Sequence, residues 1–236
     1  MEQKKYRVSV LMPCLNEEKT VALCVEKAKG FLNRNKMDGE VLVIDNASSD
    51  TSAERAKLAG ARVVRAEEQG YGVALRKGIS EAAGEYILML DCDASYDVYE
   101  GTEFLNKLEE GYDLVIGNRF KEEMEAGAMP WLHRHIGNPA LSWLGRHWSG
   151  ADVRDFHCGM RAFRKDAVEK LELKTTQMEF ASEMIMKAAN EGLQLTEVPC
   201  KLYRDGRDGK SHLRTVRDGF RHMICMWSIR KRRERA

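Results

Sequence analysis

Long hydrophobic runs are missing from this 236-residue sequence. No apolar stretch approaches the roughly 18–20 residues that a bilayer-spanning helix needs. The N-terminal stretch MEQKKYRVSV turns polar too early for a signal peptide. We therefore expect a soluble or peripherally attached protein in the cytoplasm, without a transmembrane segment.

The sequence also has no cysteine spacing typical of a metal site, few prolines and no internal repeat. The six cysteines form no CxxC pair and no zinc spacing, so we expect reduced thiols that mostly fill the core. Four prolines and the lack of any low-complexity tract argue against a long disordered linker. The length fits one α/β domain with a C-terminal appendage.

A large net charge is absent, but the charges are unevenly distributed along the chain. The total is +1, yet from Lys201 to the end 12 Lys and Arg residues stand against 4 Asp and Glu, a net +8. Such a basic tail favours an anionic partner, such as phosphate groups or an anionic membrane surface. We expect no nucleic-acid partner, and a solvated terminal helix is the alternative interpretation.

Short β-rich runs alternate with helical patterns over the first half of the sequence. Strands are predicted at 6–13, 40–45, 61–66, 85–90 and 113–119, and helices at 17–34, 51–60, 71–84 and 98–111. This alternation predicts right-handed βαβ units and a mainly parallel sheet flanked by helices.

The alternation weakens after residue 120. The patterns predict an irregular loop at 121–130, a helix over 131–150 interrupted at 137–139, a short strand and helix within 158–171, a helix over 178–192 that ends at Gly192, a strand over 193–204 and a basic amphipathic helix over 212–233.

Acidic residues follow two of the predicted strands. Asp45 comes after VLVI, and Asp91 and Asp93 come after ILML. Ligands of an open parallel sheet bind beyond the carboxyl ends of its strands. Asp97 can cap the next helix, which leaves Asp91 and Asp93 surplus to capping. Alternate side chains of an extended segment point the same way, so these two carboxylates are expected to converge while Cys92 faces the core.

Two converging carboxylates suit a hard divalent cation such as Mg²⁺ or Mn²⁺, bridged to the phosphates of a substrate. A lone D-x-D pattern is weak evidence because it occurs often by chance, and a structural role is the alternative. Its place at a strand end in this fold favours metal binding.

Gly70 and Gly72 open the helix predicted after the third strand, as in a dinucleotide-binding turn. Leu75 occupies the third glycine position of that turn, however, and the strand is the third rather than the first. We therefore expect these glycines to let the backbone approach a nucleotide.

Polar residues gather again in the second half. Asp155 and His157 share a face if their segment is extended, and Glu179 and Glu183 lie one turn apart on a predicted helix. Arginine matches phosphate oxygens well, and a surface salt bridge is the alternative for any single one. The basic residues expected to bind a diphosphate are Arg119, Arg204, Arg207, Lys210 and Arg214.

Eight motifs occur in order: MPCLNEE, VIDNASSDTS, EEQGYGVALRKG, LDCDASYD, LVIGNRF, DFHCGMRAF, MEFASEM and EVPCKLYRDGR. The ordered set resembles the inverting nucleotide-sugar glycosyltransferases of family 2, in the dolichol-phosphate mannose and glucose synthase-like branch. The resemblance implies an α/β GT-A fold over 1–211, with a nucleotide-binding part at about 1–119 and an acceptor part at about 120–211. A basic amphipathic helix would follow over 212–236.

The resemblance also implies an activity. The chain would move a hexose from a UDP- or GDP-sugar to a polyprenyl phosphate, such as undecaprenyl or dolichyl phosphate, with Mg²⁺ or Mn²⁺. One alternative is a saccharide or other hydroxyl acceptor in the synthesis of cell-envelope polysaccharide. Another is a non-catalytic protein that binds sugar nucleotides. The D-x-D motif and the carboxylates after residue 150 argue against this alternative.

Each expected role falls on residues of these motifs. Pro13, Asn16, Glu17 and Asp45 would surround the base and ribose, joined by Gly70, Gly72 and Asp91; the metal ligands would be Asp91 and Asp93; and His157, Arg161 and Glu183 would meet the acceptor. A phosphate acceptor is already an anion and needs no strong general base. A hydroxyl acceptor needs a carboxylate, for which Glu179 and then Asp155 are the candidates.

The last predicted helix is amphipathic as well as basic. Its apolar residues stand beside seven Arg or Lys residues and are Phe220, Met223, Ile224, Trp227 and Ile229. This composition suits a helix that lies in a membrane interface. The competing expectation is that the apolar face packs on the domain.

Overall fold

The computed structural model describes residues 6–206 and 215–233. Within them, seven strands form one sheet in the order β3-β2-β1-β4-β6-β5-β7. The strands are β1 (Tyr6–Cys14), β2 (Gly39–Asp45), β3 (Arg62–Arg65), β4 (Gly84–Met89), β5 (Leu114–Asn118), β6 (Arg161–Arg164) and β7 (Leu195–Pro199).

Strands β1 to β4 are parallel to one another, as the alternation predicted. Strand β6 runs antiparallel between β4 and β5, and β7 is parallel to β5. The sheet is therefore mixed, with its first four strands ending at a common edge. The predicted α/β class is confirmed.

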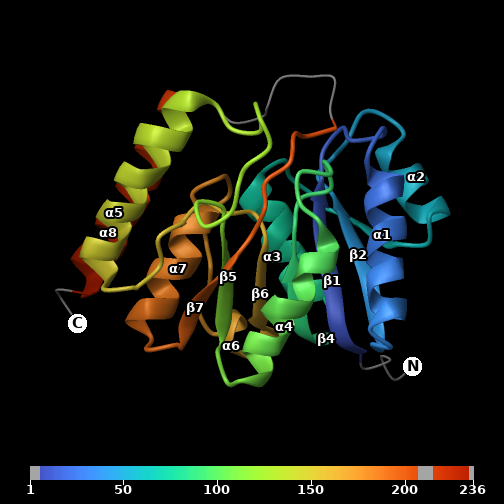
Figure 1. The fold of residues 1–236 in the computed structure, drawn as a ribbon, viewed down its shortest axis with the longest axis horizontal. Helices are drawn as coiled ribbons and strands as arrows, with labels where there is room; N and C mark the ends of the chain where they lie inside the picture. The colour runs from blue at the N-terminus through green and yellow to red at the C-terminus, as the bar shows by residue number, and fades with distance from the viewer. Residues whose placement is uncertain (1–5, 207–214, 234–236) are drawn as a thin grey trace.

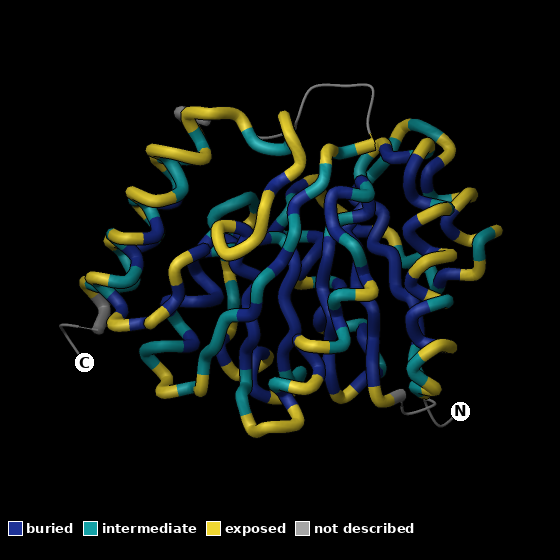
Figure 2. The backbone as a smooth tube through the Cα atoms, in the orientation of Figure 1, coloured by how far each residue is buried: buried dark blue, intermediate teal, exposed yellow. Residues whose placement is uncertain are grey.

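Helices cover both faces of the sheet; Figure 1 shows α4 in front of it and α3 behind it. The inner strands are correspondingly buried along most of their length in Figure 2, whereas the edge strands β3 and β7 are mostly half-buried. The helices are α1 (Val21–Arg34), α2 (Ser52–Leu58), α3 (Tyr71–Glu81), the 3₁₀ helix η1 (Val98–Glu100), α4 (Gly101–Glu109), the π-helix η2 (His133–Gly137), α5 (Asn138–Ser149), α6 (Lys165–Glu169), α7 (Phe180–Asn190) and α8 (Thr215–Arg233).

Two boundaries differ from the sequence prediction. The expected interruption at 137–139 is wrong, because η2 passes directly into α5 at Asn138. Pro139 lies in the first turn of α5, directly after the π-helical turn of η2. Strand β7 ends at Pro199 rather than at residue 204. The chain beyond it instead bonds to loops at the end of the sheet, as the backbone N–H of Tyr203 does to the carbonyl of Ser95 at 3.0 Å.

Helix α8 packs against α5 and α7, beyond the β7 edge of the sheet (Figure 1). Its buried residues, Asp218, His222 and Met226, recur every fourth position and so share one face. Helix α8 therefore packs on the domain, but through these residues and not through the apolar face named from the sequence, of which Phe220, Ile224 and Trp227 are exposed. No helix within 6–206 and 215–233 is both long and apolar enough to cross a bilayer.

Candidate functional site

The candidate site lies where the strand order of the sheet reverses. The chain adds β2 and β3 on one side of β1 and β4 on the other, so the carboxyl ends of β1 and β4 flank the switch point. Open α/β sheets bind their ligands at such a point. Pro13 in β1, Asp45 at the end of β2 and Asp91 after β4 all stand at this edge. The structure thus brings the residues predicted at the strand ends to one edge.

The loops after β1 and β2 are joined by hydrogen bonds. The backbone N–H of Asn16 donates to Ser48 Oγ at 3.0 Å, and that of Glu17 donates to Ser52 Oγ at 2.7 Å. The buried Asp45 accepts a bond from the Ser48 N–H at 3.0 Å. Three of the residues predicted to surround the nucleotide therefore belong to one connected pair of loops.

Asp91 and Asp93 lie in a bend that starts after β4 has ended at Met89. Extended alternation therefore does not set the direction of their side chains. Instead, the Tyr71 hydroxyl donates to Asp91 Oδ1 at 2.9 Å, and the backbone N–H of Ser95 donates to Asp93 Oδ1 at 3.0 Å. Burial, reinforced by the Asp91 carboxylate, raises the pKa of Tyr71 well above its usual value. Tyr71 is therefore protonated and holds Asp91 as a hydrogen-bond donor.

Two expectations about this turn are confirmed. Cys92 is fully buried, as a residue that faces the core should be. The Asp97 side chain accepts a bond from the Tyr99 N–H at 3.2 Å and caps η1. Asp91 and Asp93 are thus the acidic residues of the turn that capping does not explain.

The chain after β7 returns to this turn. The backbone N–H of Gly206 donates to the carbonyl of Asp93 at 2.8 Å. Arg204 is exposed, and its backbone N–H donates to Glu125 Oε2 at 2.9 Å. The basic segment therefore begins beside the D-x-D turn. The other residues of that segment predicted to bind phosphate, Arg207, Lys210 and Arg214, lie outside the described residues.

Gly70 and Gly72 lie against another segment of this same chain. A Cβ atom on Gly70 would lie 2.2 Å from the carbonyl oxygen of Thr176, and one on Gly72 would lie 2.5 Å from that of Thr175. The lack of side chains lets this segment pack against the start of α3. Contact of the two glycines with a nucleotide stays a prediction.

Arg119 and Asp155 form a buried ion pair. Nε of Arg119 donates to Oδ2 of Asp155 at 2.7 Å, and Nη2 donates to Oδ1 at 2.8 Å. Burial alone would lower the pKa of Arg119, but the Asp155 carboxylate outweighs it and raises that pKa well above its usual value. The arginine is therefore charged, and Asp155 fixes its orientation with both carboxylate oxygens.

Glu179 and Glu183 differ sharply in their contacts. Glu183 is buried and accepts bonds from Thr175 Oγ1 at 2.6 Å and Lys187 Nζ at 2.8 Å, so it ties α7 to the preceding loop. Glu179 precedes α7, and its Oε2 atom is buried without a hydrogen-bond partner among the described residues. Of the two, Glu179 is the one with an oxygen available for chemistry.

Arg161 is fully buried and bonds to carbonyl groups. Its guanidinium donates to the carbonyl oxygens of Phe156 at 2.8 Å, Cys158 at 3.0 Å and Ala181 at 3.0 Å. Burial lowers its pKa. These contacts connect β6, the segment before it and α7, which favours a structural part for Arg161 over contact with an acceptor.

His157 lies against α8. Its ring meets that of His222 edge to face, with the centroids 4.5 Å apart. Ser182 Oγ lies 2.8 Å from His222 Nδ1 and 3.5 Å from His157 Nε2. Burial lowers the pKa of His222 to about 4 and that of His157 well below its usual value. Helix α8 is therefore attached through neutral imidazoles.

This attachment predicts that acid weakens the fold. The unfolded chain binds a proton at His222 near pH 6.5 and the folded chain only near pH 4, so stability is constant above 6.5 and falls as the pH drops below it. At pH 5.5 the loss from His222 is about 1.4 kcal/mol, and His157 adds a loss of the same sign. Asp218 opposes the shift of His222, and Arg161 adds to it.

Urea denaturation at pH 7.0 and 5.5 measures this loss. A His222→Gln variant, whose side chain does not titrate, should lose less stability over the same interval than the original chain. Equal losses in the two proteins would show that His222 does not titrate as described.

Some residues of the site were missed by the sequence prediction. Tyr71 carried a signal, because it stands between two glycines at a helix start. Asn46 follows Asp45, and its Oδ1 accepts a bond from the Gly70 N–H at 2.8 Å. Glu197 of β7 accepts a bond from the Asp155 N–H at 2.8 Å, and no sequence pattern marked it.

Comparison with known proteins agrees with this geometry. Residues 9–172 match the sequence family described as glycosyl transferase family 2. The chain is 41% identical over 220 residues to the low-salt glycan biosynthesis hexosyltransferase Agl6 of Haloferax volcanii, covering 93% of this chain and 52% of that protein. It is 32% identical over 206 residues to a dolichyl-phosphate hexose transferase of the same organism, covering 87% of this chain and 86% of that protein. The chain thus spans about half the length of the first of these relatives.

A solved structure shows the same fold. Glucosyl-3-phosphoglycerate synthase from Mycobacterium tuberculosis, in complex with Mn²⁺ and UDP-glucose, superposes with a TM-score of 0.71 at 20% identity, over 95% of this chain and 79% of that chain. This likeness confirms the expected GT-A fold. The family match runs from β1 through α6 and includes both strands that flank the switch point. The chain therefore belongs to glycosyl transferase family 2.

Proposed function

We propose that the chain is a metal-dependent, inverting hexosyltransferase that uses a UDP- or GDP-sugar as donor and a polyprenyl phosphate as acceptor. The observation that carries this proposal is the D-x-D turn at the switch point, beside the joined loops after β1 and β2. The dolichyl-phosphate hexose transferase among the relatives supports the choice of acceptor.

Asp91 and Asp93 fit a divalent metal. They supply carboxylate oxygens, the ligands that Mg²⁺ and Mn²⁺ prefer, and Tyr71 already orients one of them. A metal bound there would neutralise the charge that develops on the departing nucleoside diphosphate. In this proposal Pro13, Asn16, Glu17 and Asp45 surround the base and ribose, and Gly70 and Gly72 flank the diphosphate.

Arg119 is the described cation best placed for phosphate. Asp155 engages its Nε and Nη2 atoms, so we assign the phosphate to the remaining edge of the guanidinium. A fixed cation stabilises the leaving group most when its charge is fully developed. Arg204, Arg207, Lys210 and Arg214 are assigned the same role in the segment that follows the D-x-D contact.

The acceptor part is assigned to about 120–211 and the donor part to about 1–119. Within the acceptor part, the structural contacts of Arg161, Glu183 and His157 argue against the direct role in acceptor binding that the resemblance implied for them. A polyprenyl phosphate oxygen attacks the anomeric carbon, the bond to the diphosphate breaks, and the configuration inverts. The attacking oxygen is already anionic, so no side chain must remove a proton.

A hydroxyl acceptor is the second candidate, and Glu179 favours it. The unpartnered Oε2 atom could accept the hydroxyl proton, whereas both oxygens of Asp155 are held by Arg119. General-base catalysis contributes about 10²–10⁴-fold to a rate. Glu179→Gln therefore separates the two candidates.

The experiment incubates the purified chain with UDP-glucose or GDP-mannose, Mn²⁺ and either undecaprenyl phosphate or phosphoglyceric acid. We expect lipid-linked sugar with the first acceptor, and a rate that Glu179→Gln leaves nearly unchanged. Sugar transfer only to the hydroxyl acceptor, with a large loss in Glu179→Gln, would favour the second candidate. No lipid-linked sugar with any common donor would overturn the first.

Helix α8 carries an exposed apolar stripe on the side away from its buried face. Phe220, Ile224 and Trp227 are 58%, 64% and 52% exposed and follow one another at helical spacings of four and three. Arg217 and Lys231, both exposed, stand at the two ends of this stripe. We assign this face to an anionic membrane surface on the cytoplasmic side, where each basic residue contributes about 1 kcal/mol.

Removing this face should release the protein from membranes. We expect Phe220→Ser/Ile224→Ser/Trp227→Ser to lose most of its sedimentation with anionic liposomes at low salt. Leu58→Ser is the matched control, because Leu58 is an 88% exposed apolar residue on α2, and it should sediment as the original chain does. An original chain that stays in the supernatant would contradict the assignment.

A further inference from the structure

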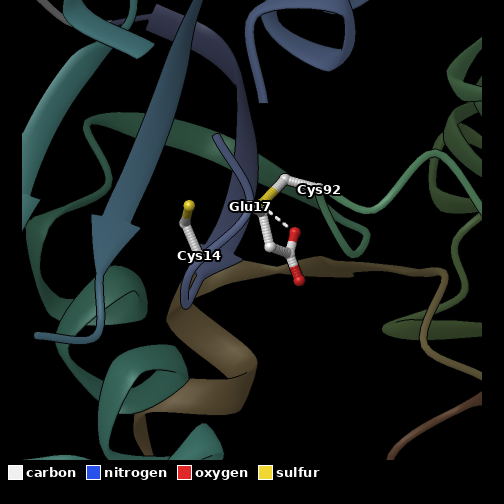
Figure 3. A group of neighbouring side chains, drawn as sticks. All are labelled: Cys14, Glu17 and Cys92. Atoms are coloured by element: carbon white, nitrogen blue, oxygen red, sulfur yellow. Dashed lines mark hydrogen bonds between the residues drawn. The ribbon is translucent and has the colours of Figure 1, made fainter. Parts of the chain in front are cut away.

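Two cysteines and a glutamate meet beneath the D-x-D turn. Cys14 and Cys92 are fully buried, and Glu17 is 7% exposed. One ligand atom from each lies within 4.8 Å of the other two, and the Cys92 thiol lies 2.8 Å from Glu17 Oε2. Figure 3 shows the three side chains gathered where β1 ends, with that hydrogen bond dashed.

The sheet produces this cluster. Strands β1 and β4 are parallel neighbours in which Leu11 pairs with Met89. Cys14 is the last residue of β1 and Cys92 lies three residues beyond the end of β4, so both thiols stand at the same end of this strand pair. The β1–α1 loop then turns back and brings Glu17 to the same place. The three side chains are thus buried together at the end of the central strands.

The donor set is chemically distinct from that of Asp91 and Asp93. Thiolates select soft or borderline cations, whereas Mg²⁺ and Mn²⁺ prefer oxygen. In a tetrahedral zinc site the Zn–S distance is about 2.3 Å, so neighbouring sulfur ligands stand about 3.8 Å apart. The ligand atoms of the cluster all lie within 4.8 Å of one another, so the two sulfurs are at most about 1 Å farther apart than that spacing.

We propose that Cys14, Glu17 and Cys92 bind one thiophilic divalent cation such as Zn²⁺, at a site separate from the D-x-D carboxylates. On binding, each thiol releases one proton to the buffer, and the two thiolates and the carboxylate become ligands. The Pro13 carbonyl accepts a hydrogen bond from the Cys92 thiol at 3.2 Å, so it loses this bond when the thiol is deprotonated. This site does not depend on the chain being a transferase.

Calorimetric titration with Zn²⁺, in the presence of excess Mg²⁺ to occupy oxygen sites, tests the proposal. We expect one equivalent to bind and about two protons to be released, measured in two buffers of different ionisation enthalpy. Titration with Co²⁺ should give the charge-transfer absorption of a thiolate ligand. Zn²⁺ affinity should fall more than about 100-fold in Cys92→Ser and Cys14→Ala, because loss of a ligand exceeds the typical cost of losing an outer partner.

Two controls decide where the metal binds. Cys24→Ala removes a buried thiol 3.3 Å from the Cys92 carbonyl but outside the cluster, and it should bind Zn²⁺ as the original chain does. Asp91→Ala/Asp93→Ala should also keep the Zn²⁺ affinity. Cys92→Ser nearly keeps the side-chain volume and keeps a hydrogen-bond donor to Glu17. It therefore tests the site even if Cys14→Ala does not fold. Unchanged binding in Cys92→Ser, or its loss in the double aspartate variant, would overturn the proposal.

Discussion

Replacing Asp91 and Asp93 together by alanine is expected to abolish the metal-dependent part of nucleotide binding. The two carboxylates are the surplus acidic groups of the turn, and Asp91 is positioned by a protonated Tyr71. Loss of an outer-shell partner of a metal site costs about 10–100-fold in affinity, so loss of both ligands should exceed 100-fold. Calorimetry with UDP and GDP, with Mn²⁺ and again with EDTA, measures the difference.

Asp97→Asn is the matched control for this experiment. Asp97 belongs to the same acidic turn, but it caps η1 through the Tyr99 N–H. The substitution should leave the effect of Mn²⁺ on nucleotide affinity intact. If the double alanine variant still binds nucleotide more tightly with Mn²⁺ than with EDTA, the metal ligands lie elsewhere.

The second large effect is expected on stability. Asp155→Ala would leave the buried guanidinium of Arg119 without its counter-ion, which costs about 3–5 kcal/mol. Urea denaturation at neutral pH measures the loss. The double variant Arg119→Met/Asp155→Ala removes both charges and should recover part of that stability, because it leaves no uncompensated charge in the interior.

An exposed ion pair provides the contrast. Arg7 and Glu109 also form a salt bridge, with side chains 57% and 46% exposed. Water and salt screen such pairs, so Glu109→Gln should change stability little. Similar losses in Asp155→Ala and Glu109→Gln would mean that the Arg119–Asp155 pair is not buried as described.

Much of the first half could be predicted from the sequence. Short β-rich runs and helical spacing predicted the order of the main elements through β5, because each βα unit buries a local pattern. The acidic residues at the strand ends were singled out from the same patterns, since a carboxylate after a buried strand is unfavourable unless it has a binding partner. The cap formed by Asp97 and the burial of Cys92 were predicted in the same way.

The second half depended on contacts that no local pattern records. Nothing in the sequence around Arg161 shows that β6 runs antiparallel between β4 and β5. The pairing of Arg119 with Asp155 joins segments far apart in the chain. Gly70 and Gly72 pack against the backbone of residues 175–176, a contact that a sequence pattern cannot identify, and their predicted contact with a nucleotide stays a prediction.

The bond from Gly206 to Asp93 has a consequence for how the molecule assembles. The two residues are separated by almost half the chain, so their contact closes a long loop and forms late in folding. During synthesis, the D-x-D turn emerges long before the segment that holds it in place. Strands β1 to β4 can thus be complete while the D-x-D turn still lacks its contact with the segment after β7.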